Sequence, residues 1–362
     1  MRTPTARYPV WVGAGLLAQS GRRIKSLRPG CRQVFVVSSP RVWRLWGARL
    51  AVGLRAAGIR AEALLMNDRE EAKRLATLER LAERLLARGA DRGALLVALG
   101  GGVVGDVTGF LAATYMRGVE VVQAPTTLVA QVDSAIGGKT GVNLRGGKNL
   151  LGVFHHPLAV LADVRTLETL PAREYRAGLY EVVKCGVLGD VTLFRFLERN
   201  LPAVLAREPQ ALRTALARAS RVKARIVGRD EHEHGERRLL NLGHTFGHAF
   251  ETLSGYRGLR HGEAVGWGLI AAARLSHRLG LLPERDARRI LRVVASVGRL
   301  PALPPAQPER VYAQLFADKK KRGKELRFVL PRRIGRAEVV EGVPRRDVLA
   351  CLRNLPDTLP AR

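Results

Sequence analysis

Short apolar runs alternate with longer amphipathic stretches through the first 165 residues of the chain. The amphipathic patterns at 41–57 and 70–89 predict helices, whereas the apolar runs predict buried strands. These runs are residues 8–12, 34–37, 61–65, 94–99, 119–123 and 158–163. Alternation of this kind is typical of a parallel sheet with helices on both faces. We therefore expect an α/β, Rossmann-like domain.

The apolar runs stop near residue 172, and helical patterns rich in Ala, Leu and Arg continue to about residue 300. Four prolines between Pro301 and Pro308 then lead into a short tail. With 362 residues, of which 46% are hydrophobic, the chain is long enough for two domains. We place the boundary at Leu170 and Pro171, so that residues 1–170 form the α/β domain and 171–362 a mostly α-helical domain.

The net charge of +29 first suggests a nucleic-acid or membrane-surface protein. The excess is spread along helical patterns, however, and the one dense basic run is only residues 319–322. We expect a solvated Arg-rich surface with a cationic pocket for an anionic small molecule, and neither a nucleic acid nor a membrane as partner. Three distant cysteines form no disulfide framework, which suits a cytoplasmic protein.

Three of the eight histidines fall within eighteen residues: His244, His248 and His261. His244 and His248 are four apart, so on a helix they share one face. Glycines beside them favour the close approach of a ligand or of another backbone. Earlier in the chain, Glu181 and Lys184 are three apart in an apolar, glycine-flanked stretch, where a carboxylate needs a cation or a metal. These patterns predict a metal site with Glu181 as a candidate ligand.

A glycine-rich turn follows the third expected strand, from Gly100 to Asp106, and a helix is expected at 106–116. Backbone amides at a helix N-terminus attract a pyrophosphate, although such a turn also occurs without any ligand. Asp68 or Glu70, after the preceding strand, is a candidate for ribose hydroxyls; the alternative is a solvated helix start.

Two further loops, 137–140 and 146–148, combine glycines with Lys139 and Lys148 and resemble anion cradles. The alternative is ordinary surface loops. The first loop resembles the end of a P-loop, but the first glycine of that motif is missing, which argues against an NTPase. Residues 231–234, Glu-His-Glu-His, are interpreted as a charged loop with one residue inside the site.

Five blocks of the sequence resemble the signature blocks of the bacterial 3-dehydroquinate synthase family. They are residues 100–118, 123–152, 178–186, 241–251 and 261–268, and the similarity extends from Tyr8 to about Val348. The resemblance implies an enzyme that binds NAD and a divalent metal, zinc or cobalt. It implies the conversion of 3-deoxy-D-arabino-heptulosonate 7-phosphate to 3-dehydroquinate and phosphate, a step of the shikimate pathway, in a homodimer.

The resemblance also implies roles for individual residues. The metal ligands would be Glu181, His244 and His261, which corrects the pairing of His244 with His248 that helical spacing suggests. NAD would contact Asp68, Glu70, Lys73, Gly102, Val103, Val104, Gly105, Asp106, Thr126, Thr127, Lys139, Lys148, Thr166, Leu167, Glu168 and Thr169. Substrate would contact Arg117, Lys139, Asn149, Arg237, Asn241 and Lys319, with Arg117 reaching the partner subunit's site. Catalytic roles would fall to His248, Asp133, Glu233, Lys184 and Lys223.

Three positions depart from the family pattern: Arg69 replaces a glycine, Ala72 an aromatic residue and Tyr180 a small residue. The alternatives are another sugar-phosphate cyclase or a metal- and NAD-dependent polyol dehydrogenase of the same superfamily. Lys223, Arg237 and Asn241 are as in 3-dehydroquinate synthase, which argues against another cyclase. A polyol dehydrogenase would release NADH, whereas a cyclase shows no net NADH. A nucleic-acid-binding protein would show steeply salt-dependent binding.

Overall fold

The computed structural model describes residues 1–255, 258–320 and 326–355, and the side chains of 317–320 are not described. The chain forms two compact units. The first consists of Met1–Pro171 with Leu212–His232, and the second of Ala172–Ala211 with Glu233–Arg362. The expectation of a parallel-sheet α/β part followed by a mostly helical part is confirmed. The boundary expected at residue 170 differs in one respect, because residues 212–232 return to the first unit.

The first unit is built on a six-stranded sheet in which all pairings are parallel. Its order is β1 (Val10–Gly13), β8 (Ala159–Asp163), β5 (Glu120–Pro125), β4 (Leu95–Gly100), β2 (Gln33–Ser38) and β3 (Arg60–Leu65). These strands correspond to the six apolar runs. β4 and β8 are buried at every position, as expected for a parallel sheet covered on both faces.

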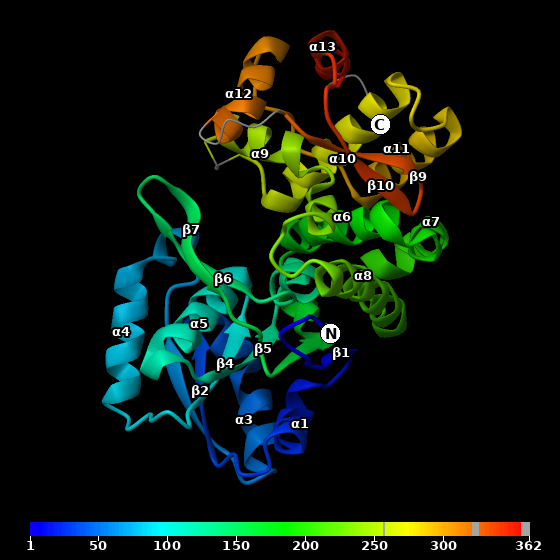
Figure 1. Ribbon diagram of the computed structural model, residues 1–362. Helices are drawn as coiled ribbons and strands as arrows, with labels where there is room; N and C mark the ends of the chain where they lie inside the picture. The colour runs from blue at the N-terminus through cyan, green and yellow to red at the C-terminus, as the bar shows by residue number, and fades with distance from the viewer. Residues whose placement is uncertain (256–257, 321–325, 356–362) are drawn as a thin grey trace. The chain divides into compact units, whose positions relative to one another are not determined.

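Alternate residues of the strands supply two separate cores. Phe35, Val37, Leu96 and Ala98 pack with α4 (Leu75–Leu86) and α5 (Gly102–Thr114). Their neighbours Val34, Val36, Leu95 and Val97 pack with α1 (Ser20–Leu27) and α3 (Ala48–Arg55) on the other face. Figure 1 shows α4 and α5 on one side of the sheet and α1 and α3 on the other. The layer arrangement follows directly from the hydrophobic pattern.

Several helix limits differ from the expected ones. The stretch 41–57 contains α2 (Pro40–Val42) and α3, joined by a π-helical segment Trp43–Gly47. The stretch 70–89 begins with a 3-10 turn, Glu70–Ala72, before α4. The helix expected at 106–116 begins at Gly102 and ends at Thr114, so the glycine-rich turn itself forms the first helical turn.

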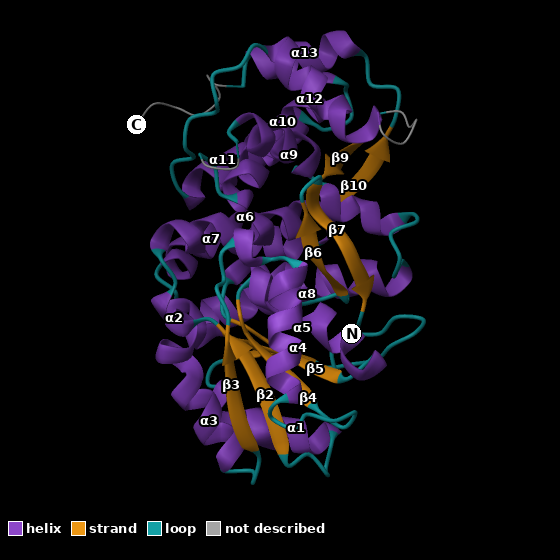
Figure 2. Cartoon of the chain, turned by 90° about the vertical axis from the view of Figure 1, so that its left-hand side faces the viewer, coloured by secondary structure: helices purple, strands orange, loops and turns teal. Residues whose placement is uncertain are grey.

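An antiparallel hairpin occupies the region that the sequence indicated as two loops. It consists of β6 (Lys139–Leu144) and β7 (Gly147–Phe154), and Figure 2 shows it as a separate two-stranded ribbon. Most of β7 is exposed, so the hydrophobic pattern that marks the other strands is missing here. Lys139 is the first residue of β6, and Lys148 and Asn149 lie at the start of β7.

The helix α8 (Pro209–Arg229) explains why residues 212–232 belong to the first unit. Its Lys223 bonds to Asp133, and its Gly228 lies so close to the carbonyl of Arg2 that a Cβ there would be 2.5 Å from the oxygen. Figure 1 shows α8 beside the N-terminal segment. These contacts join residues far apart in sequence, which local periodicity does not reveal.

The second unit is mainly helical. Its helices are α6 (Ala172–Gly189), α7 (Val191–Leu205), α9 (His244–Leu253), α10 (His261–Arg278), α11 (Glu284–Val297), α12 (Pro308–Lys320) and α13 (Arg345–Arg353). α10 is buried over most of its length and packs against α6, α9 and α11. The expected short tail contains a hairpin, β9 (Phe328–Arg333) and β10 (Arg336–Val340), that packs on α10. None of the described helices is long and apolar enough to cross a membrane.

Candidate metal centre and nucleotide site

Glu181, His244 and His261 converge within the second unit. Nε2 of His244 lies 3.5 Å from Oε1 of Glu181, and Nε2 of His261 lies 3.4 Å from the same oxygen. The nitrogen or oxygen atoms that the three residues offer all lie within 4.8 Å of one another. The helices α6, α9 and α10 each contribute one of the three side chains. The structure thus contains a Glu/His site able to hold a metal.

Two glycines of α10 allow its N-terminal half to approach the neighbouring backbones. A Cβ on Gly262 would lie 1.9 Å from the carbonyl oxygen of Ala177 in α6. A Cβ on Gly268 would lie 1.8 Å from the carbonyl oxygen of Gly243, just before α9. These approaches require glycine and bring the start of α10, which carries His261, next to Glu181 and His244.

The donor atoms have the spacing that a metal needs. Ligands 2.0–2.2 Å from a tetrahedral zinc lie roughly 3.3–3.6 Å apart, in agreement with the separations of 3.4 and 3.5 Å. Both oxygens of Glu181 are buried, and neither has a hydrogen-bond partner in suitable geometry among the described residues. Lys184 Nζ lies 2.6 Å from Oε2 as an ion pair, whereas Oε1 faces the imidazoles of His244 and His261. A buried carboxylate is costly unless its charge is compensated, so its position here favours the binding of a cation.

The ionisation states of Glu181 and His244 favour metal binding, whereas the protonation of His261 opposes it. Burial opposes the charge of Glu181, but Lys184 and the two histidines hold its pKa well below the usual range. Burial, reinforced by Lys184, lowers the pKa of His244 to about 3, so its imidazole is neutral. Burial also opposes the charge of His261, yet the nearby carboxylates of Glu181 and Glu251, at 3.4 and 3.3 Å, raise its pKa to about 10. A metal at this site would displace the proton of His261.

A second set of contacts orients the two imidazoles. Nδ1 of His244 lies 3.2 Å from the carbonyl oxygen of Leu242, and Nδ1 of His261 lies 3.3 Å from Oε2 of Glu251. When each Nδ1 carries the proton, Nε2 keeps its lone pair for a metal, an arrangement common around metal-bound histidines. Glu251 is buried, in α9.

His248 lies beside the trio but belongs to a different grouping. Its ring is exposed, 5.4 Å from the ring of His244 and 6.2 Å from that of His261, measured between centroids. It shares ligand spacing with Glu251 and His261 instead. Glu251 already contacts Nδ1 of His261, and His248 is exposed, so Glu181, His244 and His261 are the better candidate ligands.

The remaining sequence-predicted residues of the second unit lie around α9 and the turn before it. Arg237 is buried, and Asn241 donates from Nδ2 to Oε1 of Glu233 at 3.1 Å. The backbone of Lys319 lies in α12, but its side chain is outside the described residues.

In the first unit, the N-terminus of α5 presents unpaired backbone amides. α5 begins at Gly102, and no side chain caps it at Gly101. The amides of Gly102, Val103 and Val104 precede the first intrahelical bond, which Gly105 donates to Gly101. An anion at this helix end would satisfy these amides. The glycine-rich turn therefore fits a phosphate group.

A polar cluster next to this helix end gathers four of the predicted residues. Lys73 is buried, and its Nζ donates to Oδ2 of Asp106 and to Oδ1 of Asn149, each at 2.5 Å. Burial raises the pKa of Asp106, and Lys73 opposes the rise. Glu70 joins through Asn143, whose Nδ2 lies 2.8 Å from Oε1 of Glu70. The turn after β3, the start of α5 and the β6–β7 hairpin thus meet at one place.

A second ion pair, between buried Lys223 and partly buried Asp133, links α8 to the π-helical turn Ala130–Ser134. Nζ of Lys223 donates to the backbone oxygen of Asp133 at 2.6 Å and to its carboxylate. The structure therefore brings together two of the residues to which the sequence assigned catalytic roles.

The other predicted nucleotide residues are distributed along the same unit. Thr126 and Thr127 follow β5 directly, and the amide of Thr126 donates to Gly100 O. Thr166, Leu167, Glu168 and Thr169 form the 3-10 turn after β8. The Thr166 and Thr169 hydroxyls accept from Gln131 and Trp46, so both have structural partners. Asp68, Lys139 and Lys148 are exposed.

Unusual backbone geometry coincides with three predicted site residues. Five non-glycine residues of the described chain have positive φ: Met116, Arg117, Asn149, Arg207 and Glu233. Arg117 (φ 69°), Asn149 (φ 57°) and Glu233 (φ 63°) are sites that the sequence assigned to substrate or catalysis. Such conformations cost on the order of 1–3 kcal/mol each and are concentrated at functional sites.

The three departures from the family pattern fit the local structure. Arg69 has φ −77° and ψ 153°, which any residue adopts, so no glycine is required there. Ala72 ends the short 3-10 turn and is partly buried. Tyr180 is buried and donates to the carbonyl of Gly298 at 3.1 Å. A Cβ on Gly266 would lie 2.9 Å from the Tyr180 ring, so the glycine makes room for it.

Sequence reasoning missed Glu251 and Asn143. Glu251 lies three residues after His248, so a helical projection places an acid next to the histidines. No pattern in the sequence indicated Asn143, because the hairpin that positions it was not predicted.

Comparison with known proteins gives a consistent result. A family model described as 3-dehydroquinate synthase N-terminal matches residues 63–177, and one described as 3-dehydroquinate synthase C-terminal matches residues 178–321. The chain is 46% identical to a 3-dehydroquinate synthase of Solibacter usitatus (strain Ellin6076), over 98% of both chains. It is 47% identical to that of Caulobacter vibrioides (strain NA1000 / CB15N), over 95% of both.

Solved structures share the fold. A 2-epi-5-epi-valiolone synthase from Streptomyces hygroscopicus subsp. jinggangensis 5008, with NAD+ and Zn2+ bound, is 33% identical with a TM-score of 0.86, over 97% of both chains. A 2-deoxy-scyllo-inosose synthase complexed with carbaglucose-6-phosphate, NAD+ and Co2+ is 28% identical with a TM-score of 0.85, over 96% of both.

Proposed function

The chain belongs to the 3-dehydroquinate synthase family, and from this premise we propose that it converts 3-deoxy-D-arabino-heptulosonate 7-phosphate to 3-dehydroquinate and phosphate. It is an enzyme of the lyase class that acts on a sugar phosphate. The observation that carries the proposal is the convergence of Glu181, His244 and His261 at metal-ligand spacing. The match to full-length relatives named 3-dehydroquinate synthase supplies the substrate.

Glu181, His244 and His261 would hold the divalent metal, zinc or cobalt. Three protein ligands leave coordination positions for substrate hydroxyls, and the ion would act as a Lewis acid that lowers the pKa of those hydroxyls. Lys184, buried against Oε2 of Glu181, offsets the charge of that carboxylate and supplies a cation for the substrate.

NAD would supply a hydride acceptor that is regenerated in each turnover. The uncapped N-terminus of α5 would bind its pyrophosphate through the amides of Gly102 to Val104. Lys73 would hold this site together, since it joins Asp106 at the start of α5 to Asn149 of the hairpin.

Proton transfer is assigned to His248, which lies next to the metal trio without being one of its members. An imidazole exchanges protons near neutral pH, as elimination of phosphate and closure of the ring both require. Asp133 would hold the ammonium group of Lys223 in position to contact the substrate. Glu233 would do the same for the amide of Asn241.

Anion binding would use Arg237, Lys139, Lys223 and Lys319, and Arg117 would act in a homodimer by reaching the partner subunit's site. The left-handed backbone of Arg117 and of Met116 before it turns the chain sharply ahead of Gly118. We place the enzyme in the cytoplasm, where its three buried cysteines would stay reduced.

A substrate panel tests the proposed activity. The enzyme, supplied with NAD and zinc or cobalt, is offered the heptulosonate 7-phosphate or a hexose 6-phosphate, and phosphate release is followed. Phosphate from the heptulosonate alone, with 3-dehydroquinate as product, supports the proposal. Release from the hexose 6-phosphate instead would indicate a cyclase like the 2-deoxy-scyllo-inosose synthase that shares the fold.

A further inference from the structure

We propose that His156 is a positioning residue for the 137–139 loop, which comprises Gly137, Gly138 and Lys139. The inference rests on the proposed function, in which Lys139 contacts the anionic substrate and NAD. His156 fills the space between this loop and a buried carboxylate, Glu231, that follows α8. It therefore fixes the backbone position from which the Lys139 side chain extends.

The backbone of the loop has a conformation that depends on two glycines. Gly137 (φ 106°) and Gly138 (φ 70°) are consecutive left-handed residues, a conformation in which only glycine is relaxed. The amide of Gly137 donates to the hydroxyl oxygen of Tyr8 at 3.0 Å, and the amide of His155 donates to Gly138 O at 2.8 Å. Two glycines in sequence gain much freedom if the packing around them is lost.

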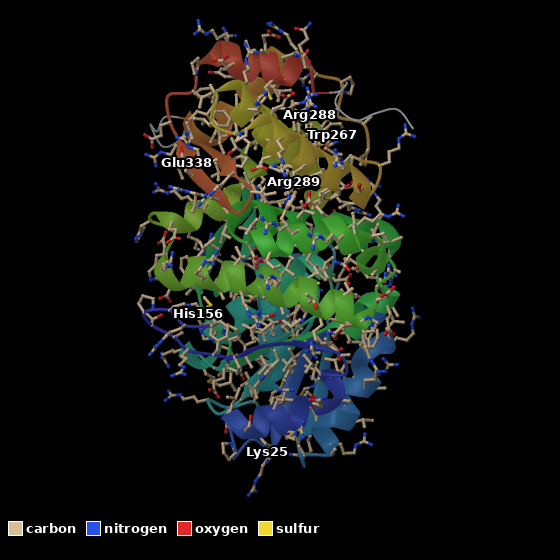
Figure 3. The ribbon with its side chains drawn as sticks, turned by 90° about the vertical axis from the view of Figure 1, so that its right-hand side faces the viewer. Lys25, His156, Trp267, Arg288, Arg289 and Glu338 are labelled. Carbon is tan, nitrogen blue, oxygen red and sulfur yellow. The ribbon has the colours of Figure 1, made fainter. Side chains whose placement is uncertain are left out.

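His156 supplies that packing. A Cβ on Gly138 would lie 2.8 Å from Nδ1 of His156, so the imidazole is in contact with the loop backbone. Only 10% of the His156 side chain is exposed, and its ring lies 5.6 Å from the ring of Tyr8 between centroids. Figure 3 shows His156 beside the N-terminal segment, which contains Tyr8.

Glu231 holds the ring from the opposite side. Its Oε1 lies 2.6 Å from Nε2 of His156, and the carboxylate also accepts from the amide and the hydroxyl of Thr5. Burial opposes its charge, but the bonds to Thr5 and His156 lower the pKa of Glu231 to about 2, so it is ionised at neutral pH. A buried carboxylate that loses a hydrogen-bond partner keeps the cost of its burial, so this contact is sensitive to the removal of His156.

The two ends of the segment 133–139 are thus fixed to the same helix region. Lys223 of α8 bonds to Asp133 at one end, and Glu231, just after α8, acts through His156 at the other. Loss of the second link should loosen the Gly137–Gly138 backbone before Lys139, while the segment stays attached at Asp133. Substrate binding should then weaken more than the chemical steps.

The test compares His156→Leu with His156→Gln by hydrogen exchange and by kinetics. His156→Leu removes the bond to Glu231, whereas the amide of Gln still donates to it. Amides of 137–139 should exchange about tenfold faster or more in His156→Leu, as expected for the loss of a charged hydrogen bond. KM for the heptulosonate phosphate should rise about fivefold or more with kcat changed less than about threefold, the pattern of lost binding. His156→Gln should restore most of both values.

Three further variants make the result decisive. His277→Leu is the control, since His277 is an exposed histidine of α10, outside the predicted site, that bonds to Leu282 O. Glu231→Gln probes the same contact without loss of volume, should His156→Leu not fold, and should also speed loop exchange. Unchanged exchange at 137–139, or equal acceleration in His277→Leu, overturns the inference. If Lys139→Met leaves KM unchanged, the role of Lys139 in the proposed function is wrong, and the exchange comparison alone decides about His156.

Discussion

Oε2 of Glu251 lies 3.3 Å from Nδ1 of His261, so the imidazole that faces Glu181 through Nε2 is held from behind by a second carboxylate. The contact fixes the ring and requires the proton to reside on Nδ1, which leaves Nε2 as the ligand atom. In this account Glu251 shapes the metal site without binding the metal.

Glu251→Gln should therefore lower the affinity for zinc or cobalt about 10- to 100-fold, the usual effect of removing an outer carboxylate. Competition with a chromophoric chelator measures this affinity directly. Glu309→Gln, which removes an exposed partner of Arg353 in the same unit, is the control and should bind metal as the wild type does. Wild-type affinity in Glu251→Gln would show that the contact does not orient His261.

His248→Ala should slow turnover but retain close to one equivalent of metal, because His248 lies outside the Glu181–His244–His261 trio. His244→Ala should lose the metal. Elemental analysis of the two purified variants separates these outcomes, and added imidazole should partly restore the turnover of His248→Ala. Metal loss in His248→Ala would favour the alternative grouping of His248, Glu251 and His261.

Glu233→Gly should lower kcat at least about tenfold while leaving the melting temperature no lower than that of the wild type. Glycine relieves the left-handed strain at φ 63°, roughly 1 kcal/mol, but removes the carboxylate that holds Asn241. Arg207→Gly, at φ 62° and outside the predicted site, should keep full activity. A Glu233→Gly variant that is both unstable and active would contradict a functional origin of the strain.

The lowered pKa of Glu231 predicts how the free energy of unfolding depends on pH. Its pKa is lowered to about 2 in the folded protein from an ordinary value of 4.5, so its stabilisation is present above pH 4.5 and is lost as the pH falls toward 2. Urea unfolding should show a constant stability difference between the wild type and Glu231→Gln near neutral pH, narrowing below pH 4.5. A difference that widens on acidification would mean that the carboxylate is not paired as described.

Much of the fold could be predicted from the sequence. The six parallel strands are buried on both faces and therefore consist of continuous apolar runs, which β4 and β8 show most clearly. The hairpin β6–β7 could not be predicted, because its strands are held by mutual backbone bonds and β7 is largely exposed. The assignment of α8 to the first unit could not be predicted either, because it depends on contacts of Lys223 and Gly228 with residues far away in sequence.

The candidate site was predictable to a similar extent. Residue types and blocks indicated Glu181, His244 and His261, whereas helical spacing alone paired His244 with His248. The close approach of α10 to α6 and α9, which Gly262 and Gly268 permit, brings His261 to ligand spacing from Glu181 and His244, and spacing along one helix does not encode that approach. The supporting contacts of Glu251, Asn143 and His156 depend on tertiary packing, which no local pattern encodes.

The central claim is that one metal, held by Glu181, His244 and His261, works with a recycled NAD on a single sugar phosphate. Its most direct test follows phosphate release from the heptulosonate 7-phosphate and NADH absorbance in the same sample, with and without a chelator. The account predicts phosphate release that the chelator abolishes and added zinc or cobalt restores, with no accumulation of NADH. Phosphate release that persists without metal, or NADH that accumulates in step with phosphate, would contradict it.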